Sequence, residues 1–208
     1  MKNYLNFINE GRVVNFYNPN EANFVILMGG PGSGKSTISN NFINIRNARV
    51  FNVDLERESK AKKLGLNLNN PEDNDEILKY TRSSTDPNNR TIKLLKSTLM
   101  NSDTNKELPN IIFDTVGTHV DLIKELISLA KEKGYNTTMV LIKCDLETAL
   151  DRNRKRKRKL SDEIVIDYHN RVKKTFDVLY PLYDNAWIVD NSLDFDTTKR
   201  RDIVHKLK

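Results

Sequence analysis

Residues 23–37 read Asn-Phe-Val-Ile-Leu-Met-Gly-Gly-Pro-Gly-Ser-Gly-Lys-Ser-Thr, an apolar run followed at once by a glycine-rich loop. The pattern G-x-x-x-x-G-K-[ST] is completed by Gly29, Gly34, Lys35 and Ser36. Between a strand and a helix this pattern forms a phosphate-binding loop, because glycines let main-chain N–H groups turn inward around an anion. The stretch therefore predicts a strand over 23–28, a phosphate loop and a helix over 35–45.

The residues of this loop suit a nucleotide and its metal ion. Lys35 is placed to reach the β- and γ-phosphates, and the hydroxyl of Ser36 is a ligand for Mg²⁺. Thr37 lies one residue deeper, near the α-phosphate, and the helix N-terminus adds its positive dipole end. We therefore expect ATP and Mg²⁺ as cofactors, with a nucleotide-binding set made of Gly30, Pro31, Gly32, Ser33, Gly34, Lys35, Ser36 and Thr37.

The rest of the chain alternates short strand-like runs with longer helical runs, and residues 66–75 read as a loop. Further strands are expected at 49–53, 111–114, 137–142 and 186–189. Helices are expected at 54–64, 75–81, 88–101, 118–133 with Thr118 as cap, 146–156, 162–179 with Ser161 as cap, and 198–208. Such alternation predicts an α/β fold with a parallel sheet and helices on both faces.

The composition sets limits on the class of protein. The 208 residues suit one domain, which we expect over 23–208 after an N-terminal extension over 1–22 that contains a hairpin around 13–17. The longest apolar run, 24–28, is too short to cross a bilayer, so we expect no membrane segment. The single cysteine allows no internal disulfide, which favours a reducing, cytoplasmic setting.

The net charge of +6 is concentrated in residues 152–159, Arg-Asn-Arg-Lys-Arg-Lys-Arg-Lys, and the rest of the chain is close to neutral. At helical spacing Arg152 and Arg156 share one face, and Arg154 and Arg158 share another. Arginines that close over a nucleotide stabilise the charge of phosphoryl transfer, so this run is a candidate lid. A patch for nucleic-acid phosphates, a nuclear-localisation run or a solvated basic face would have the same composition.

Three acids follow strand-like runs, where ligands of open parallel sheets bind. Asp114 ends Ile-Ile-Phe-Asp, a pattern typical of the acid that holds the Mg²⁺ shell, although a neighbouring helix N-terminus would also satisfy it. Asp54 is a candidate base for the proton of an attacking hydroxyl, or a cap of the helix that follows. Asp145 is predicted to cap the helix that starts at 146.

Together these residues resemble the small P-loop kinases that include zeta toxins and the kinase domain of bacteriophage polynucleotide kinases. The resemblance lies in the loop 30–37, in a second strand ending in Asp54, and in the segment 152–165, with a looser match at 111–115. It implies that Asp54 activates the acceptor, and that Arg152 and Arg156 bind ATP phosphates and stabilise the transition state. The fold class that we expect is that of a P-loop NTPase. Its five-stranded parallel sheet would have the order 2-3-1-4-5, with helices on both faces and a helical lid at about 152–163.

The expected function is an ATP-dependent kinase acting on a hydroxyl of a nucleotide, a nucleic-acid 5′ end or a nucleotide-sugar. The catalytic set is Lys35, Asp54, Arg152 and Arg156, and the metal set is Ser36 and Asp114. The alternative is a P-loop ATPase or nucleotide-gated nucleic-acid-binding module without an acceptor. Residues 55–105, where such kinases bind acceptors, match no known pocket, and their candidate acceptor-phosphate contacts are Arg57, Arg82 and Arg90. A phage-encoded kinase would work in the host cytoplasm.

Overall fold

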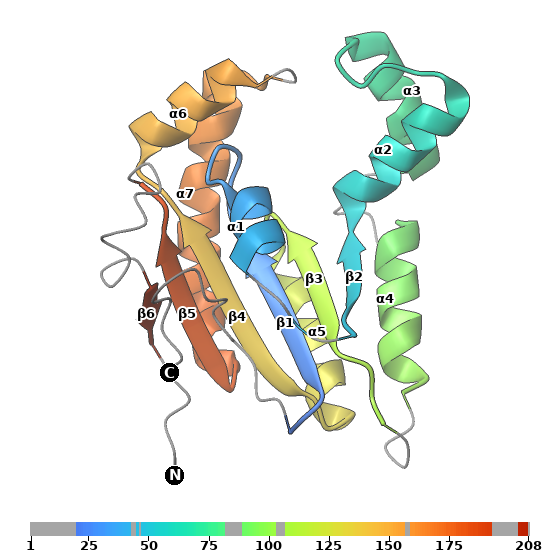
Figure 1. Cartoon of the computed structure of the whole chain (residues 1–208), viewed down its shortest axis with the longest axis vertical. Helices are drawn as coiled ribbons and strands as arrows, with labels where there is room; N and C mark the ends of the chain where they lie inside the picture. The colour runs from blue at the N-terminus through green and yellow to red at the C-terminus, as the bar shows by residue number, and fades with distance from the viewer. Residues whose placement is uncertain are drawn as a thin grey trace.

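One sheet runs through the middle of the molecule (Figure 1), and its strands are β1 (Asn23–Met28), β2 (Arg49–Asn52), β3 (Ile111–Thr115), β4 (Asn136–Lys143), β5 (Asn185–Asp190) and β6 (Val204–Lys206). Their order across the sheet is β2-β3-β1-β4-β5-β6. The first five strands pair in parallel, whereas β6 runs antiparallel to β5. The predicted five-stranded parallel sheet in the order 2-3-1-4-5 is confirmed, with a short strand added at its edge.

The helices are α1 (Lys35–Phe42), α2 (Val53–Leu64), α3 (Pro71–Thr81), α4 (Arg90–Met100), α5 (Val120–Glu132), α6 (Leu146–Lys155), α7 (Asp162–Leu179) and the 3-10 turn η1 (Tyr180–Leu182). The structure is a computed structural model that describes residues 20–42, 45, 47–81, 89–102, 107–156, 159–192 and 204–207. The predicted hairpin around 13–17 lies outside these residues. Within them, no helix is long and apolar enough to cross a membrane.

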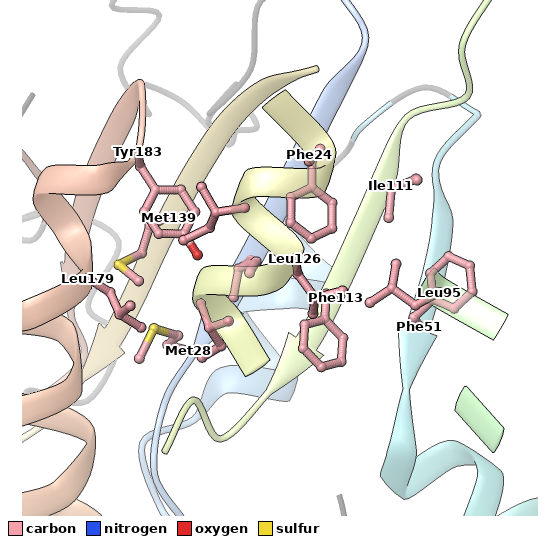
Figure 2. Close-up of a cluster of buried hydrophobic side chains, with 14 of the residues drawn as sticks. Phe24, Met28, Phe51, Leu95, Ile111, Phe113, Leu126, Met139, Leu179 and Tyr183 are labelled. Atoms are coloured by element: carbon pink, nitrogen blue, oxygen red, sulfur yellow. The ribbon is translucent and has the colours of Figure 1, made fainter. Parts of the chain in front are cut away.

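Helices cover both faces of the sheet because the strands are apolar on both sides. All of β1 is buried, as expected for a central parallel strand. Phe24, Ile26 and Met28 point to a core shared with α4, α5 and α7. Val25 and Leu27 point the other way, to a core that includes Ile38 of α1. Figure 2 shows the first core, where Phe24, Phe113 and Leu126 come together.

Two helices begin at residues for which the sequence predicts other structure. Helix α2 starts at Val53, and its cap is Asn52, whose side-chain oxygen accepts from the N–H groups of Asp54 and Leu55. Asp54 therefore lies in the first turn of α2, and its prediction as the end of a strand or as the helix cap is wrong. Helix α3 starts at Pro71, inside the predicted loop 66–75, because Asn70 accepts from the Glu72 amide and Pro suits a first helical position.

Two further predictions are wrong. Helix α5 has His119 rather than Thr118 at its N-cap, without a side-chain cap bond. Within the predicted terminal helix 198–208, residues 204–206 form β6. Asp145 and Ser161 do cap α6 and α7 as predicted, by accepting from the amides of Thr148 and Ile164.

Candidate functional site

The phosphate loop joins β1 to α1 at the carboxyl edge of the sheet. The Ser33 N–H donates to the Gly30 carbonyl at 3.1 Å, which closes a tight turn. Gly32 and Gly34 both have φ of 80°, the left-handed region that glycine adopts without strain. A Cβ at Gly32 would lie 2.3 Å from the Ala149 carbonyl oxygen, so the loop packs closely against α6. The segment thus has the conformation that an anion-binding loop requires.

Lys35 and Asp114 meet at this edge, as predicted for residues of one nucleotide site. Lys35 Nζ donates to Asp114 Oδ1, and both side chains are largely buried. The other oxygen, Asp114 Oδ2, accepts from Asn52 Nδ2 at 2.7 Å. The reason is the sheet register, which pairs Asp114 with Leu27 on one side and with Asn52 on the other. Asp114 Oδ1 is therefore held by Lys35 of α1, and Oδ2 by Asn52 of the neighbouring strand β2.

Asp54 lies at the same edge but faces solvent. Its side chain is 64% exposed, and Arg57 Nη1 approaches its Oδ1 at 3.7 Å from one helical turn along α2. The side chain of Arg57 is 15% exposed, and its Nε is buried without a hydrogen bond to any described residue. The helix also carries Glu56, which accepts from the Thr91 amide at 3.2 Å and so ties α2 to the start of α4. Asp54 is thus an accessible carboxylate on an anchored helix.

The two lid arginines are placed differently from each other. Arg152 lies on α6 and donates from Nη1 to the Asn191 carbonyl at 2.8 Å. Arg156 follows the end of α6 in extended conformation and is exposed. The prediction that the two share one helix face is therefore wrong, and Arg158 lies outside the described residues. Arg152 belongs to the phosphate loop's surroundings, since its Nη1 is 3.7 Å from a Cβ built at Gly34.

Other charges of the basic run have partners within the lid. Arg154 pairs with Asp162 at the start of α7, and Lys155 pairs with Asp151 at 2.6 Å. The connection is also held by Asn153, which is fully buried, donates to the Leu160 carbonyl at 2.8 Å and accepts from its N–H at 3.2 Å. The run is therefore built into a helix–loop–helix, and fewer of its cations are available for a nucleic-acid surface.

Three asparagines contribute to the site although the sequence did not predict them: Asn52, Asn153 and Asn191. Asn52 had a usable signal, because an Asn followed by acids two and four residues later is typical of a helix N-terminus. Asn153 and Asn191 had no such signal, because the chain contains 26 asparagines and nothing local marks these two. The partner of Asn153 is Leu160, beyond the end of α6, and the partner of Asn191 is Ser33, 158 residues away.

Two further side chains, those of His119 and Cys144, have shifted pKa values that fit structural roles. Burial, together with the charge of Arg171, lowers the pKa of His119 below its ordinary value. Burial raises the pKa of the Cys144 thiol, whose Sγ lies 3.7 Å from the Gly32 carbonyl oxygen. A thiol kept protonated in this way is a poor nucleophile.

Ser36 and Asp114 together have the donor chemistry that Mg²⁺ prefers. A hydroxyl and a carboxylate are hard oxygen ligands, and Mg²⁺ is usually held by one or two such groups together with waters and phosphates. Ser36 is exposed in the first turn of α1. Asp114 lies on β3, the strand next to β1, near the carboxyl edge of the sheet where the phosphate loop lies. The residues present therefore fit a magnesium ion that binds with a phosphate chain.

The strand, glycine loop and helix, with Lys35 beside an acid on the next strand, define the class of protein: the chain has the fold of a P-loop NTPase. It belongs to a family of AAA domains, whose family model matches residues 24–179. No curated protein sequence matches the chain significantly.

Solved structures share this fold at low sequence identity. The PezAT chromosomal toxin–antitoxin system of Streptococcus pneumoniae contains a chain with a TM-score of 0.58 and 19% identity, covering 87% of this chain and 70% of that one. A chain of the AvrRxo1-ORF1:-ORF2 structure with ATP has a TM-score of 0.57 and 17% identity, and the match covers 83% of this chain and 55% of that one. A chain of the Pnkp1/Rnl/Hen1 RNA repair complex has a TM-score of 0.51 and 18% identity, and the match covers 76% of this chain and 46% of that one. This chain thus spans about half the length of the last two, and the predicted P-loop kinase-like fold is confirmed.

Proposed function

We propose that this protein is an ATP-dependent kinase that transfers the γ-phosphate to a hydroxyl of a nucleotide, a nucleic-acid 5′ end or a nucleotide-sugar. The observation that carries the proposal is the chain of contacts from Lys35 through Asp114 to Asn52, because Asn52 also caps the helix that bears Asp54. An exposed carboxylate is thereby kept at the same edge of the sheet as the phosphate loop. An ATPase without an acceptor has no need of that carboxylate.

ATP is the nucleotide of this proposal, bound on the loop 30–37. Main-chain N–H groups of the loop bind the phosphates, and Lys35 turns from Asp114 to the β- and γ-phosphates when they arrive. Mg²⁺, held by Ser36 with help from Asp114, supplies positive charge to the phosphate oxygens when it is bound. The ATP in the AvrRxo1-ORF1:-ORF2 structure, which has the same fold, supports this choice of nucleotide.

In the proposed reaction Asp54 takes the proton of the acceptor hydroxyl. The acceptor oxygen forms a bond to the γ-phosphorus, and the bond between that phosphorus and the bridging oxygen of ADP breaks. The exposure of Asp54 lets an acceptor reach it, and Nη1 of Arg57 lies 3.7 Å from its Oδ1. Arg152 and Arg156 lie on the lid and stabilise the charge that spreads over the equatorial oxygens.

The acceptor carries a phosphate of its own in this proposal. Arg57 lies beside Asp54, its buried Nε has no hydrogen-bond partner among the described residues, and a guanidinium matches a phosphate in geometry and charge. Of the other two candidates, Arg90 is exposed at the start of α4, and Arg82 lies outside the described residues. Similarity to a chain from an RNA repair complex supports a nucleotide or nucleic-acid acceptor.

The test is transfer of label from γ-labelled ATP to candidate acceptors by the wild type and by Asp54→Asn. We expect the wild type to label an acceptor and the variant to lose transfer by at least about a hundredfold, since general-base catalysis contributes about 10²–10⁴. ATP affinity, measured separately, should stay within about threefold of wild type, because Asp54 touches the acceptor and not the loop.

Glu58→Gln is the matched control, since Glu58 is an exposed acid on the same helix. It should transfer phosphate like the wild type. Equal transfer by Asp54→Asn would remove the base assignment. Free phosphate without any labelled acceptor would favour the alternative, an ATPase or nucleotide-gated binding module.

A further inference from the structure

The residue that follows β5, Asn191, connects three segments of the site that are far apart in the sequence. It is 6% exposed. Its N–H donates to the Lys143 carbonyl at 2.7 Å, which extends the pairing of β4 with β5. Its Nδ2 donates to the Ser33 carbonyl at 2.8 Å, and its own carbonyl accepts from Arg152 Nη1 at 2.8 Å. One buried residue thus links the sheet, the phosphate loop and the lid helix.

The bond to Ser33 matters because of how a phosphate loop works. When main-chain N–H groups turn inward to bind an anion, the carbonyl groups of the loop turn outward and need donors of their own if they are buried. The Ser33 carbonyl has such a donor in Asn191. Since an acceptor faces this side chain, the atom next to Ser33 is the NH₂ group of the amide.

The packing around this contact is close. A Cβ at Gly34 would lie 2.1 Å from Asn191 Nδ2, so this glycine leaves the space that the amide fills. The amide is therefore wedged against the loop between Ser33 and Gly34. A small displacement of the Asn191 side chain would move the loop atoms that surround the phosphates.

We propose that Asn191 is a positioning residue of the nucleotide site, which holds the phosphate loop in its anion-binding shape through its side chain and aims Arg152 at the loop through its carbonyl. This inference rests on the proposed binding of ATP to the loop. It makes no use of an acceptor. Asn191 acts on the phosphates through Ser33 and does not touch the base in this proposal.

Asn191→Ala and Asn191→Asp remove the donor in two ways, and nucleotide binding with Mg²⁺ present measures the result. Alanine leaves the Ser33 carbonyl buried without a donor, and we expect ATP to bind about tenfold more weakly. Aspartate keeps the size of the side chain but places a carboxylate against that carbonyl, so its loss should be larger. Aspartate also serves if the alanine variant fails to fold, and thermal unfolding without nucleotide shows which variants are folded.

Inorganic tripolyphosphate, which has no base, separates positioning of the loop from a contact to adenine. If Asn191 shapes the loop, each variant loses affinity for tripolyphosphate, measured by competition, by the same factor as it loses affinity for ATP. Unchanged tripolyphosphate binding with weaker ATP binding would overturn the proposal in favour of a base contact. Unchanged binding of both ligands would overturn it outright.

Ser192→Ala is the neighbouring control. Ser192 Oγ accepts from the Asp145 main-chain N–H at 2.9 Å and donates to Asp190 Oδ1 at 2.6 Å, and neither partner belongs to the phosphate loop, so its variant should bind both ligands like the wild type. If the proposed kinase function is wrong, the protein labels no acceptor, but its ATP affinity still depends on Asn191. The two proposals therefore fail in different measurements.

Discussion

At the residue scale, Gly34 shows how one missing side chain decides the shape of the site. Its φ of 80° is left-handed, and a Cβ there would collide with the Asn191 amide at 2.1 Å. Gly65, after α2, has a similar φ of 69° but nothing within 4 Å of the same position. A substitution at Gly65 therefore meets only the cost of a left-handed backbone, whereas a substitution at Gly34 meets that cost and a steric clash as well.

We expect Gly65→Ala to lower the free energy of unfolding by about 1–2 kcal/mol, the cost of left-handed backbone for an L-residue, and to leave ATP binding unchanged. Gly34→Ala carries the same backbone cost and also pushes Asn191 from Ser33, so ATP should bind more than about tenfold more weakly. Urea unfolding and ATP titration of both variants measure this. Equal ATP affinities would show that the close approach at Gly34 has no role in binding.

At the element scale, the lid is a pair of helices joined into one unit. Asn153 bonds both main-chain groups of Leu160, and Arg154 pairs with Asp162 across the connection. A small core beneath them contains Cys144, Ala149 and Val165. These contacts end α6 at Lys155, although the basic run that follows has good helix formers, which explains why Arg156 does not continue the face of Arg152.

Removing the Asn153 side chain should loosen this connection. Asn153→Ala leaves two part-buried main-chain groups of Leu160 without the partners they have in the wild type, and we expect a loss of about 1–2 kcal/mol in the free energy of unfolding. Trypsin should also cut faster within 152–159 under native conditions. Asn170→Ala, at an exposed position of α7, is the control and should match the wild type in both measurements. A trypsin rate equal to that of the wild type would contradict the role of Asn153.

The start of the lid should respond to acid through Asp145. The main-chain N–H of Thr148, and then its hydroxyl, lower the pKa of Asp145 below its ordinary value of 3.8. Because the folded pKa is the lower one, the charged carboxylate stabilises the fold above pH 3.8, and this contribution is lost as the pH falls through the folded pKa.

Asp145→Ala should therefore cost about 1 kcal/mol near pH 7, and the difference from wild type should shrink in urea unfolding below about pH 4. Asp145→Asn still caps the helix and should retain most of the stability at pH 7. A difference between Asp145→Ala and wild type that stays constant down to pH 3 would show that the charge of Asp145 contributes nothing.

At the scale of the whole molecule, the sheet and its two cores hold the site in place. The α4, α5 and α7 side of the sheet contains the aromatic and aliphatic side chains drawn in Figure 2. Helix α4 lies against the edge of the sheet at β2, so its packing supports the strand that ends in Asn52. Damage to this core should lower stability first and activity only as a consequence.

Two adjacent leucines of α4 test this. Leu95 is fully buried and Leu94 is 56% exposed, while both have the same helix propensity. Leu95→Ala should lower the free energy of unfolding by about 2–4 kcal/mol, and Leu94→Ala by less than about 0.5 kcal/mol. Urea unfolding measures both. Similar losses would mean that α4 does not pack on the sheet through Leu95.

Much of the fold could be predicted because its signals are local. A strand buried on both faces must be apolar along its whole length, as β1 is, and a phosphate loop needs glycines at set positions. Asp145 and Ser161 as caps follow from side chains that reach two or three residues ahead. The start of α3 was missed for the opposite reason, since Asn and Pro mark both loops and helix starts.

By itself, the sequence predicted the parallel sheet with its strand order, the phosphate loop, and the placement of Lys35 and Asp114 in one nucleotide site. Only the tertiary structure decided that α6 stops before Arg156 and that the Asn191 side chain donates to the Ser33 carbonyl. Ser33 and Asn191 are 158 residues apart, and no periodicity or motif connects them. Such contacts depend on how the strands are ordered and packed, and the chain acquires them only when the sheet has formed.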